Sequence, residues 1–189
     1  TGEILTNILW SVKMGTEISV QDNFLGTEYF QHLKNEILHN SFPWTVSTVH
    51  ESLSISDYQM VHGVCNTTNG NHVIGSSFYE ELGHLINLLD ALCILRIKIN
   101  LLKRETEIYE HPLHVDWPHA PSNLYTSILY FNTNNGYTRF EDGTKIESVE
   151  NRLVTFPNYY KHSGTTNNCT EPHRCLMNIN YFKKEIPNA

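Results

Sequence analysis

The sequence predicts a mainly β domain of the sandwich or jelly-roll type with flanking helices. Three observations lead to this prediction. From residue 92 onward the chain reads as short strands broken by turn residues, with "LRIKINL" the most regular alternation. Two amphipathic segments with helical spacing precede those strands. With 189 residues and 40% hydrophobic residues, the chain is long enough to form one domain with a core of its own.

Two helices are expected within residues 1–91, which are interpreted as an N-terminal helical and mixed layer. The segment "TEYFQHLKNEIL" starts with Thr27 as a plausible cap and places Phe30, Leu33 and Ile37 on one face. The segment "SFYEELGHLINLLDAL" opens with a capping-box pattern. Ser77 and Glu80 form that capping box. The segment also has an apolar stripe, made of Phe78, Leu82, Leu85, Ile86 and Leu89. Both helices are interpreted as scaffold.

Residues 92–182 are assigned to the β core. In "LRIKINL", Leu95, Ile97, Ile99 and Leu101 occupy one face and Arg96, Lys98 and Asn100 the other. Further strands are expected at roughly 105–109, 112–117, 124–132, 137–140, 145–148, 152–156 and 174–182. Turn signals lie at Asn134-Asn135-Gly136, Asp142-Gly143 and Pro157-Asn158. The polar face of 95–101 is either solvated or lines the mouth of the barrel on the substrate side.

Composition excludes several classes of partner. The net charge of −7 and the pI near 5.8 argue against binding along a nucleic-acid backbone, which requires a basic surface. The four cysteines contain no CxxC pair and are expected to be free thiols of a reducing compartment, so a cytoplasmic location is predicted. No apolar run reaches the roughly 18 residues that a membrane-spanning helix needs.

The stretch "HPLHVDWPHAP" contains a candidate metal-binding pair, His114 and Asp116. On a strand these two side chains point to the same face, close enough to share one ion. An imidazole and a carboxylate, completed by a distant second imidazole, form the triad that holds Fe(II) with open positions. An HxD pair alone is expected by chance in about one such chain in four. The competing interpretation is a solvated strand face.

Further along, "RLVTFPNYYKHSG" ends near His162, and the strand "HRCLMNINYF" carries Arg174. Arg174 shares a face with Leu176 and Asn178, whereas Cys175, Met177 and Ile179 occupy the other. An arginine in an apolar strand is costly to bury unless a carboxylate meets it, and its guanidinium suits bidentate carboxylate binding. An edge-strand charge or a structural ion pair remains the alternative.

The ordered combination of these motifs resembles the Fe(II)- and 2-oxoglutarate-dependent dioxygenases, and most nearly their prolyl-4-hydroxylase-like branch. "YTSILYFNTNNGYTRFEDG" is similar to that branch's Tyr-Leu-Asn strand leading to a Gly-Gly-x-Thr-x-Phe turn. The resemblance covers roughly residues 92 to 182 and, more faintly, "ISVQDNFLGTEYF". It departs at Gly136-Tyr137-Thr138, where the family usually has Gly-Gly-x-Thr, and at Arg174, where many prolyl 4-hydroxylases use lysine.

The resemblance implies a double-stranded β-helix (jelly roll) forming a single oxygenase domain over residues 1–189. His114, Asp116 and His162 would be the iron ligands. Arg174 would pair with the distal carboxylate of 2-oxoglutarate, and Tyr130 would donate a hydrogen bond to it. The implied reaction consumes O2 and 2-oxoglutarate, releases succinate and CO2, and hydroxylates a C–H bond of a peptidyl (prolyl) or small-molecule substrate. Because Asp116 stands where the halogenating branch has a small residue, hydroxylation is implied rather than halogenation.

Strand geometry also ranks the remaining candidates. His111 lies three residues before His114 and is expected to face away from it, and His119 is expected in a loop at the rim at most. His173 adjoins Arg174 and is expected to point the opposite way. If His114 and Asp116 face the barrel interior, then Leu113, Val115 and Trp117 are expected to be buried on the other side, against the helices.

Two other functions stay open from the sequence. A non-catalytic jelly-roll or cupin-like metal-binding module would have no cosubstrate and no specific role for Arg174. A nucleobase-demethylating oxygenase would share the triad but require a basic groove, which an acidic chain does not indicate.

Overall fold

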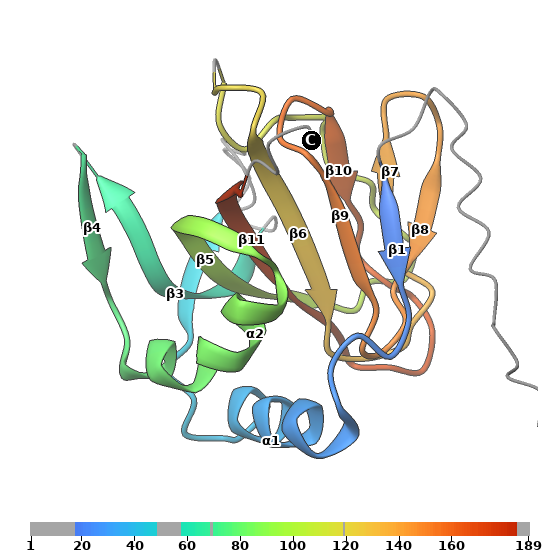
Figure 1. Ribbon diagram of the computed structural model, residues 1–189. Coiled ribbons are helices and arrows are strands. Elements are labelled where there is room, and N and C mark those ends of the chain that lie inside the picture. The colour runs from blue at the N-terminus through green and yellow to red at the C-terminus, as the bar shows by residue number, and fades with distance from the viewer. Residues whose placement is uncertain (1–17, 49–57, 69, 119, 185–189) are drawn as a thin grey trace, which may run out of the picture.

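The computed structural model of the chain describes residues 18–48, 58–68, 70–118 and 120–184. Two antiparallel sheets and two short helical regions make up this part (Figure 1). The larger sheet has eight strands, in the order β1 (Ser19–Gln21), β9 (Leu153–Pro157), β6 (Leu124–Tyr130), β11 (His173–Lys183), β5 (Ala91–Lys103), β3 (Tyr58–Thr68) and β2 (Thr45–Thr48), with β4 (Asn71–Ile74) also paired to β3. The smaller sheet has the order β10 (His162–Gly164), β7 (Tyr137–Phe140) and β8 (Lys145–Glu147).

The mainly β jelly roll with flanking helices is therefore confirmed. The strands predicted from 95, 124, 137, 145, 152 and 174 onward correspond to β5 to β9 and β11, with ends that differ by a few residues. The Asp142-Gly143 turn joins β7 to β8, where Gly143 takes a φ of +88° that favours glycine. The larger sheet also includes β1 to β4 from the N-terminal half, so both halves of the chain share one sheet.

One hydrophobic core lies between the helices and the larger sheet (Figure 1). Helix α1 (Thr27–Ile37) buries its apolar face through Phe30, Leu33 and Ile37, as the helical spacing predicts. The sheet contributes side chains from the helix-facing sides of β5 and β11, among them Ile97, Ile99, Met177 and Ile179. Each such side chain contributes about 1.5–3 kcal/mol when fully buried.

A second core lies between the two sheets. Its buried members are Leu102, Ile128, Tyr130, Phe140, Val154, Phe156 and Leu176. On β5, Ile97 and Ile99 belong to the first core, whereas Leu102, on the opposite face, belongs to the second, because successive side chains of a strand point to opposite faces. The polar members of the same inner face, Arg96, Lys98 and Asn100, consequently point toward the smaller sheet rather than toward the helices.

The helix starts differ from the predicted ones. Gly26, not Thr27, precedes α1, and no side chain caps it. The second predicted helix is a 3-10 turn, η1 (Ser77–Leu82), followed by α2 (Gly83–Leu88). Its cap is Ser76, whose hydroxyl accepts from Phe78 N at 3.2 Å, so the Ser77–Glu80 capping box is wrong. The cap falls one residue earlier because Ser76 has the extended backbone that an N-cap requires.

The predicted strands at 105–109 and 112–117 are wrong. Residues 104–118 make only isolated bridges to the chain around 162–167. Pro112 and Pro118 explain part of this result, since proline removes a backbone donor from a sheet ladder.

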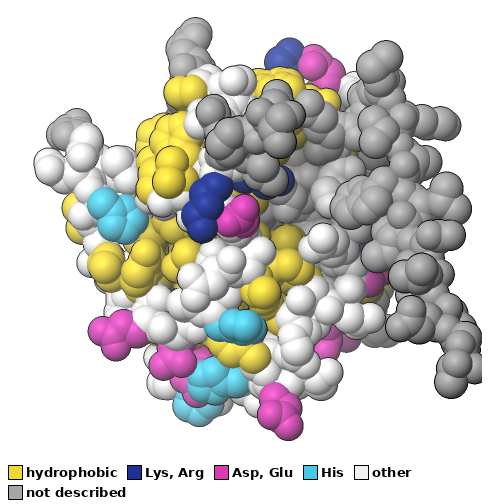
Figure 2. Space-filling view, viewed as in Figure 1, with side chains coloured by type: hydrophobic (Ala, Val, Ile, Leu, Met, Phe, Trp, Pro, Cys, Tyr) yellow, Lys and Arg dark blue, Asp and Glu magenta, His cyan; other side chains and the backbone are white. Residues whose placement is uncertain are grey.

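The face that carries the helices has an acidic, histidine-containing surface. In Figure 2, acidic and histidine side chains gather over α1 and α2, where His32 Nε2 lies 3.0 Å from Glu81 Oε2. Among the described residues, no helix has the length and apolar character needed to cross a membrane.

Candidate functional site

A cavity of about 370 Å³ lies between the two sheets. Its walls combine inward-facing side chains of β5 and β11 with residues of β7 and β10. The cavity holds His114, Asp116 and His162 together with Arg174, so one space contains both groups of residues that the sequence singled out. Its size is that of a small-molecule site, for which the range is roughly 300–1,000 Å³.

Two backbone hydrogen bonds place the two histidines side by side. His114 and His162 form an isolated antiparallel bridge. His114 N donates to His162 O at 3.0 Å, and His162 N donates to His114 O at 2.9 Å. Directly opposed residues of such a pair carry their side chains on the same face. The fold thus joins two imidazoles that are far apart in the sequence.

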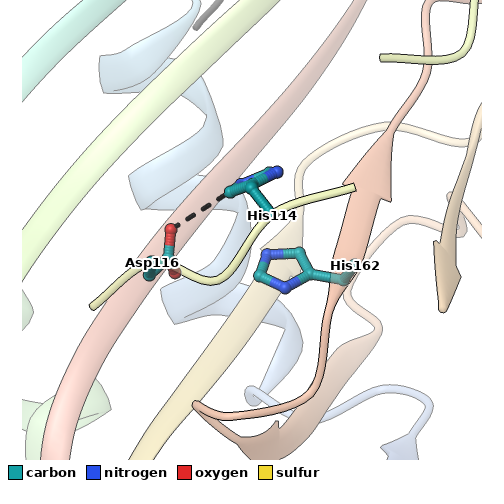
Figure 3. A group of neighbouring side chains, drawn as sticks. All are labelled: His114, Asp116 and His162. Carbon is teal, nitrogen blue, oxygen red and sulfur yellow. Dashed lines mark ion pairs between the residues drawn. The ribbon is translucent and has the colours of Figure 1, made fainter. Parts of the chain in front are cut away.

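His114, Asp116 and His162 converge on one point (Figure 3). One potential ligand atom from each lies within 4.8 Å of the other two. His114 Nε2 is 3.9 Å from Asp116 Oδ1, and the two imidazole centroids are 4.7 Å apart. Two imidazoles and one carboxylate approaching from one side are the donor set that non-haem Fe(II) takes, with other coordination positions left open.

The second nitrogen of each imidazole is fixed by a backbone carbonyl. His114 Nδ1 lies 3.2 Å from Pro112 O, and His162 Nδ1 lies 3.1 Å from Tyr160 O. Because a carbonyl oxygen only accepts, Nδ1 must carry the proton and donate. This tautomer leaves the Nε2 lone pair as the metal ligand, which is the arrangement that outer hydrogen bonds give to metal-binding histidines.

Asp116 is held by three side chains of the larger sheet. Arg96 Nη2 lies 2.8 Å from Asp116 Oδ1, and Asn180 Nδ2 donates to Asp116 Oδ2 at 2.8 Å. Thr126 Oγ1 donates to the same Oδ2 at 3.3 Å. Burial raises the pKa of the Asp116 carboxyl, but the charge of Arg96, followed by His162 and the Asn180 hydrogen bond, outweighs burial and lowers the pKa below its usual range. Asp116 is therefore an ionised, oriented carboxylate.

Arg174 is 1% exposed and has neutral partners. Its Nε donates to Ser148 Oγ at 2.7 Å, Nη1 to Thr165 O at 3.3 Å and Nη2 to Thr138 Oγ1 at 3.3 Å. Burial lowers the pKa of the guanidinium, and no carboxylate of the described residues forms an ion pair with it. A buried cation without a counter-ion is energetically costly, and an anionic ligand would remove that cost.

Two glycines lie beside the Arg174 side chain, and Gly136 makes room for it. A Cβ added at Gly136 would lie 2.7 Å from Arg174 Cδ and 2.9 Å from Thr166 O. A Cβ at Gly164 would lie 3.4 Å from Arg174 Nη1. Gly136 is the glycine of the Asn134-Asn135-Gly136 signal, so this position has a packing reason to be glycine in addition to its turn character.

Tyr130 is fully buried beside Arg174. Its hydroxyl lies 2.7 Å from Thr138 Oγ1, and its ring centroid lies 5.4 Å from Arg174 Cζ. Burial raises the pKa of Tyr130, partly offset by the Arg174 charge, so the phenol is a neutral hydrogen-bonding group. Thr138, rather than Tyr130, forms the cavity wall at this point in the described chain.

The strand-based ranking of the other histidines holds only in part. The expectation that His111 faces away from His114 is wrong, because His111 is 4% exposed and lines the same cavity. The parity argument fails because residues 111–116 are not a continuous strand. His173 is half-buried outside the cavity lining, and His119 lies outside the described residues.

The expected burial of Leu113, Val115 and Trp117 against the helices is also wrong. All three are only partly buried, and neither hydrophobic core contains them. Val115 instead joins His114 and Asp116 in the cavity lining. Without a strand, neighbouring side chains need not point to opposite faces.

The polar face of β5 lines the cavity. Arg96, Lys98 and Asn100 all contribute to its wall, which favours the interpretation of this face as the mouth of a barrel over that of a solvated surface. Sequence reasoning missed the supporting residues Asn180 and Ser148, which hold Asp116 and Arg174. A usable signal existed for Asn180, since it continues the inward-facing series of Arg174, Leu176 and Asn178.

Comparison with known proteins identifies the fold. No family model and no curated protein matches the sequence. Solved structures do match. A prolyl-4-hydroxylase from Pseudomonas putida is 13% identical, with a TM-score of 0.59 over 90% of this chain and 95% of that one. An oxidoreductase of the 2OG-Fe(II) oxygenase family from Burkholderia pseudomallei is 11% identical, with a TM-score of 0.67 over 92% and 87%.

A third similar structure is a prolyl hydroxylase from Trichoplax adhaerens in complex with a hypoxia inducible factor peptide fragment. It is 15% identical, with a TM-score of 0.62 over 89% of this chain and 84% of that one. At such identities the likeness concerns the path of the backbone. The chain therefore has the jelly-roll fold of the 2OG-Fe(II) oxygenases, including that of the prolyl-4-hydroxylase-like branch.

Proposed function

We propose that the chain is an Fe(II)- and 2-oxoglutarate-dependent oxygenase that hydroxylates a C–H bond of a peptidyl, including prolyl, or small-molecule substrate. The observation that carries the proposal is the joint presence, in one cavity, of a two-histidine, one-carboxylate group and a buried arginine without a carboxylate partner among the described residues. A metal-binding module without a cosubstrate would not explain the buried arginine. The shared fold supports the same class.

The residues fit the cofactors by their chemistry. His114, Asp116 and His162 would hold Fe(II), with both imidazole tautomers fixed and the carboxylate ionised. Arg174 would receive the distal carboxylate of 2-oxoglutarate. Because Tyr130 lies behind the cavity wall, we give it and Thr138 the role of positioning the guanidinium, in place of the hydrogen bond from Tyr130 to that carboxylate that the resemblance implies. When bound, iron and 2-oxoglutarate supply the oxidising chemistry, in which O2 is consumed and succinate and CO2 are released. The protein contributes orientation and a cavity shielded by two sheets.

Anaerobic addition of Fe(II) and 2-oxoglutarate tests the proposal. The wild-type protein should develop a visible charge-transfer band, and Arg174→Gln should require a much higher 2-oxoglutarate concentration for it. After admission of air, wild-type protein should release succinate, with His114→Ala as the inactive control. A protein that binds Fe(II) but gives no band and no succinate with any peptide or metabolite tested would instead be a non-catalytic binding module.

A further inference from the structure

A second cation faces the cavity, at a distance from Arg174. Lys98 lies on β5 two residues after Arg96, so both side chains point into the cavity, about 7 Å apart along the strand. Arg174 pairs with Leu102 of β5 in the sheet. Leu102 is four residues after Lys98, so the two positions are roughly 13 Å apart along the strand. Lys98 is therefore near the metal-binding group rather than near the residue proposed to anchor the cosubstrate.

Lys98 differs from its neighbour Arg96 in its charge balance. Arg96 is neutralised by Asp116 at 2.8 Å. For Lys98, no ion pair with a carboxylate of the described residues is found, and the residue is only partly exposed. Burial lowers the pKa of its ammonium group and the Arg96 charge lowers it further, whereas Asp116 opposes them. One positive charge at this end of the cavity thus lacks a counter-charge in the described chain.

The immediate surroundings of Lys98 are open and polar. On the neighbouring strand β3, Lys98 pairs with Gly63, where an added Cβ would meet no atom within 4 Å. On the other neighbouring strand, β11, Lys98 pairs with Asn178. Asn178 Oδ1 and Asn100 Oδ1 are both buried without a hydrogen-bond partner among the described residues, and both side chains line the cavity. Buried acceptors of this kind are normally satisfied, so these two oxygens are placed to accept from a bound molecule.

We propose that Lys98 binds a carboxylate of the primary substrate. Asn100 and Asn178 accept hydrogen bonds from N–H or O–H groups of the same substrate. The substrate is then a small carboxylic acid, with a free amino acid the best fit, rather than an internal residue of a peptide. A single uncompensated charge matches a monoanion better than a phosphate dianion. The cavity of about 370 Å³, which must also admit 2-oxoglutarate, has the size of a small-molecule site. This inference rests on the proposed oxygenase function.

The test compares free acids with their neutral derivatives. The standard amino acids and their C-terminal amides are assayed for stimulated succinate release. Their binding to the metal-free protein is also followed by saturation-transfer NMR. At least one free acid should bind and stimulate release, and its amide should bind about 10- to 100-fold more weakly, as expected when a hydrogen bond to a charged group is lost.

Variants locate the effect. Lys98→Met should weaken binding of the same acid about 10- to 100-fold, and Lys98→Arg should retain more of it. Lys103→Met is the matched control. Lys103 lies on the same strand, pairs with Glu105 at 2.7 Å and does not line the cavity, so its loss should leave binding unchanged. 2-Oxoglutarate affinity should be equal in wild type and Lys98→Met.

Each contrary result has a separate meaning. If Lys98→Met weakens 2-oxoglutarate rather than the acid, Lys98 belongs to the cosubstrate site and the proposal is wrong. The proposal is equally wrong if no free acid binds, or if blocked peptides bind as well as free acids. In these cases the charge-transfer band and succinate release of the wild type would still stand. If the wild-type protein shows neither the charge-transfer band nor succinate release, the proposed oxygenase function itself is wrong.

Discussion

Two arginines line the same cavity and are stabilised in opposite ways. Arg96 forms an ion pair with Asp116, whose carboxylate is nearly buried. Arg174 is more deeply buried, and its hydrogen bonds go to neutral oxygens of Ser148, Thr138 and Thr165. The first arginine completes its charge balance within the described chain, whereas the second does not. The difference indicates that one arginine supports the structure of a site and the other awaits an anionic ligand.

The largest expected effect comes from removing the Arg174 charge. Arg174→Gln should weaken 2-oxoglutarate binding roughly 100-fold or more, because truncating a buried hydrogen-bonded charge pair costs about 2–5 kcal/mol. Anaerobic titration in the presence of metal measures this affinity. Arg174→Lys, which retains the charge, should lose less. Equal 2-oxoglutarate affinity in wild type and Arg174→Gln would remove the functional distinction between the two arginines.

The matching experiment removes the charge of Arg96 and measures stability. Arg96→Met leaves the Asp116 carboxylate buried without its cation, and the loss should be about 2–3 kcal/mol, below the full value for a buried pair because Arg96 is partly exposed. The melting temperature of the metal-free protein should fall by roughly 5–10 °C. Addition of a divalent metal should recover part of the loss, since the ion replaces the missing charge. A melting temperature equal to that of Arg174→Gln would contradict the comparison.

The space around Arg174 can be tested without changing any charge. Gly136→Ala would bring a Cβ to 2.7 Å from Arg174 Cδ and should destabilise the protein by about 1–3 kcal/mol, the usual effect of overpacking. Thermal unfolding measures the change. Gly63→Ala serves as control, because its added Cβ meets no described atom within 4 Å. Equal melting temperatures for the two variants would show that Arg174 moves freely.

The smallest effect is expected at Thr126. Its hydrogen bond to Asp116 is 3.3 Å long, and Asn180 holds the same oxygen at 2.8 Å. Thr126→Val should therefore lower metal affinity by no more than about 1 kcal/mol, or roughly fivefold. Metal titration compares it with Asn180→Leu, which removes the shorter bond and should have the larger effect. The reverse order would mean that Thr126 is the main support of the carboxylate.

Sequence patterns predicted the regular parts of the fold well. The alternation in 95–101 and 174–182 led to β5 and β11, and helical spacing led to the buried face of α1. These patterns are reliable because a strand or helix that buries one face repeats apolar residues at its own period. Residues 105–111 lack this repeat. In 112–117, Leu113, Val115 and Trp117 do repeat with period two, but no strand forms, in part because Pro112 and Pro118 remove backbone donors from a sheet ladder. With the predicted strand failed the parity argument that placed His111 outside the cavity.

The sequence by itself determined which residue types were present in which order: the His114–Asp116 pair, a distal histidine and an arginine in an apolar strand. Only the tertiary structure decided which of them meet, because two backbone hydrogen bonds between residues far apart in the chain place His114 beside His162. It also decided the charge balance. That Arg96 is neutralised and Arg174 is not depends on contacts across separate strands, and no local pattern encodes such contacts.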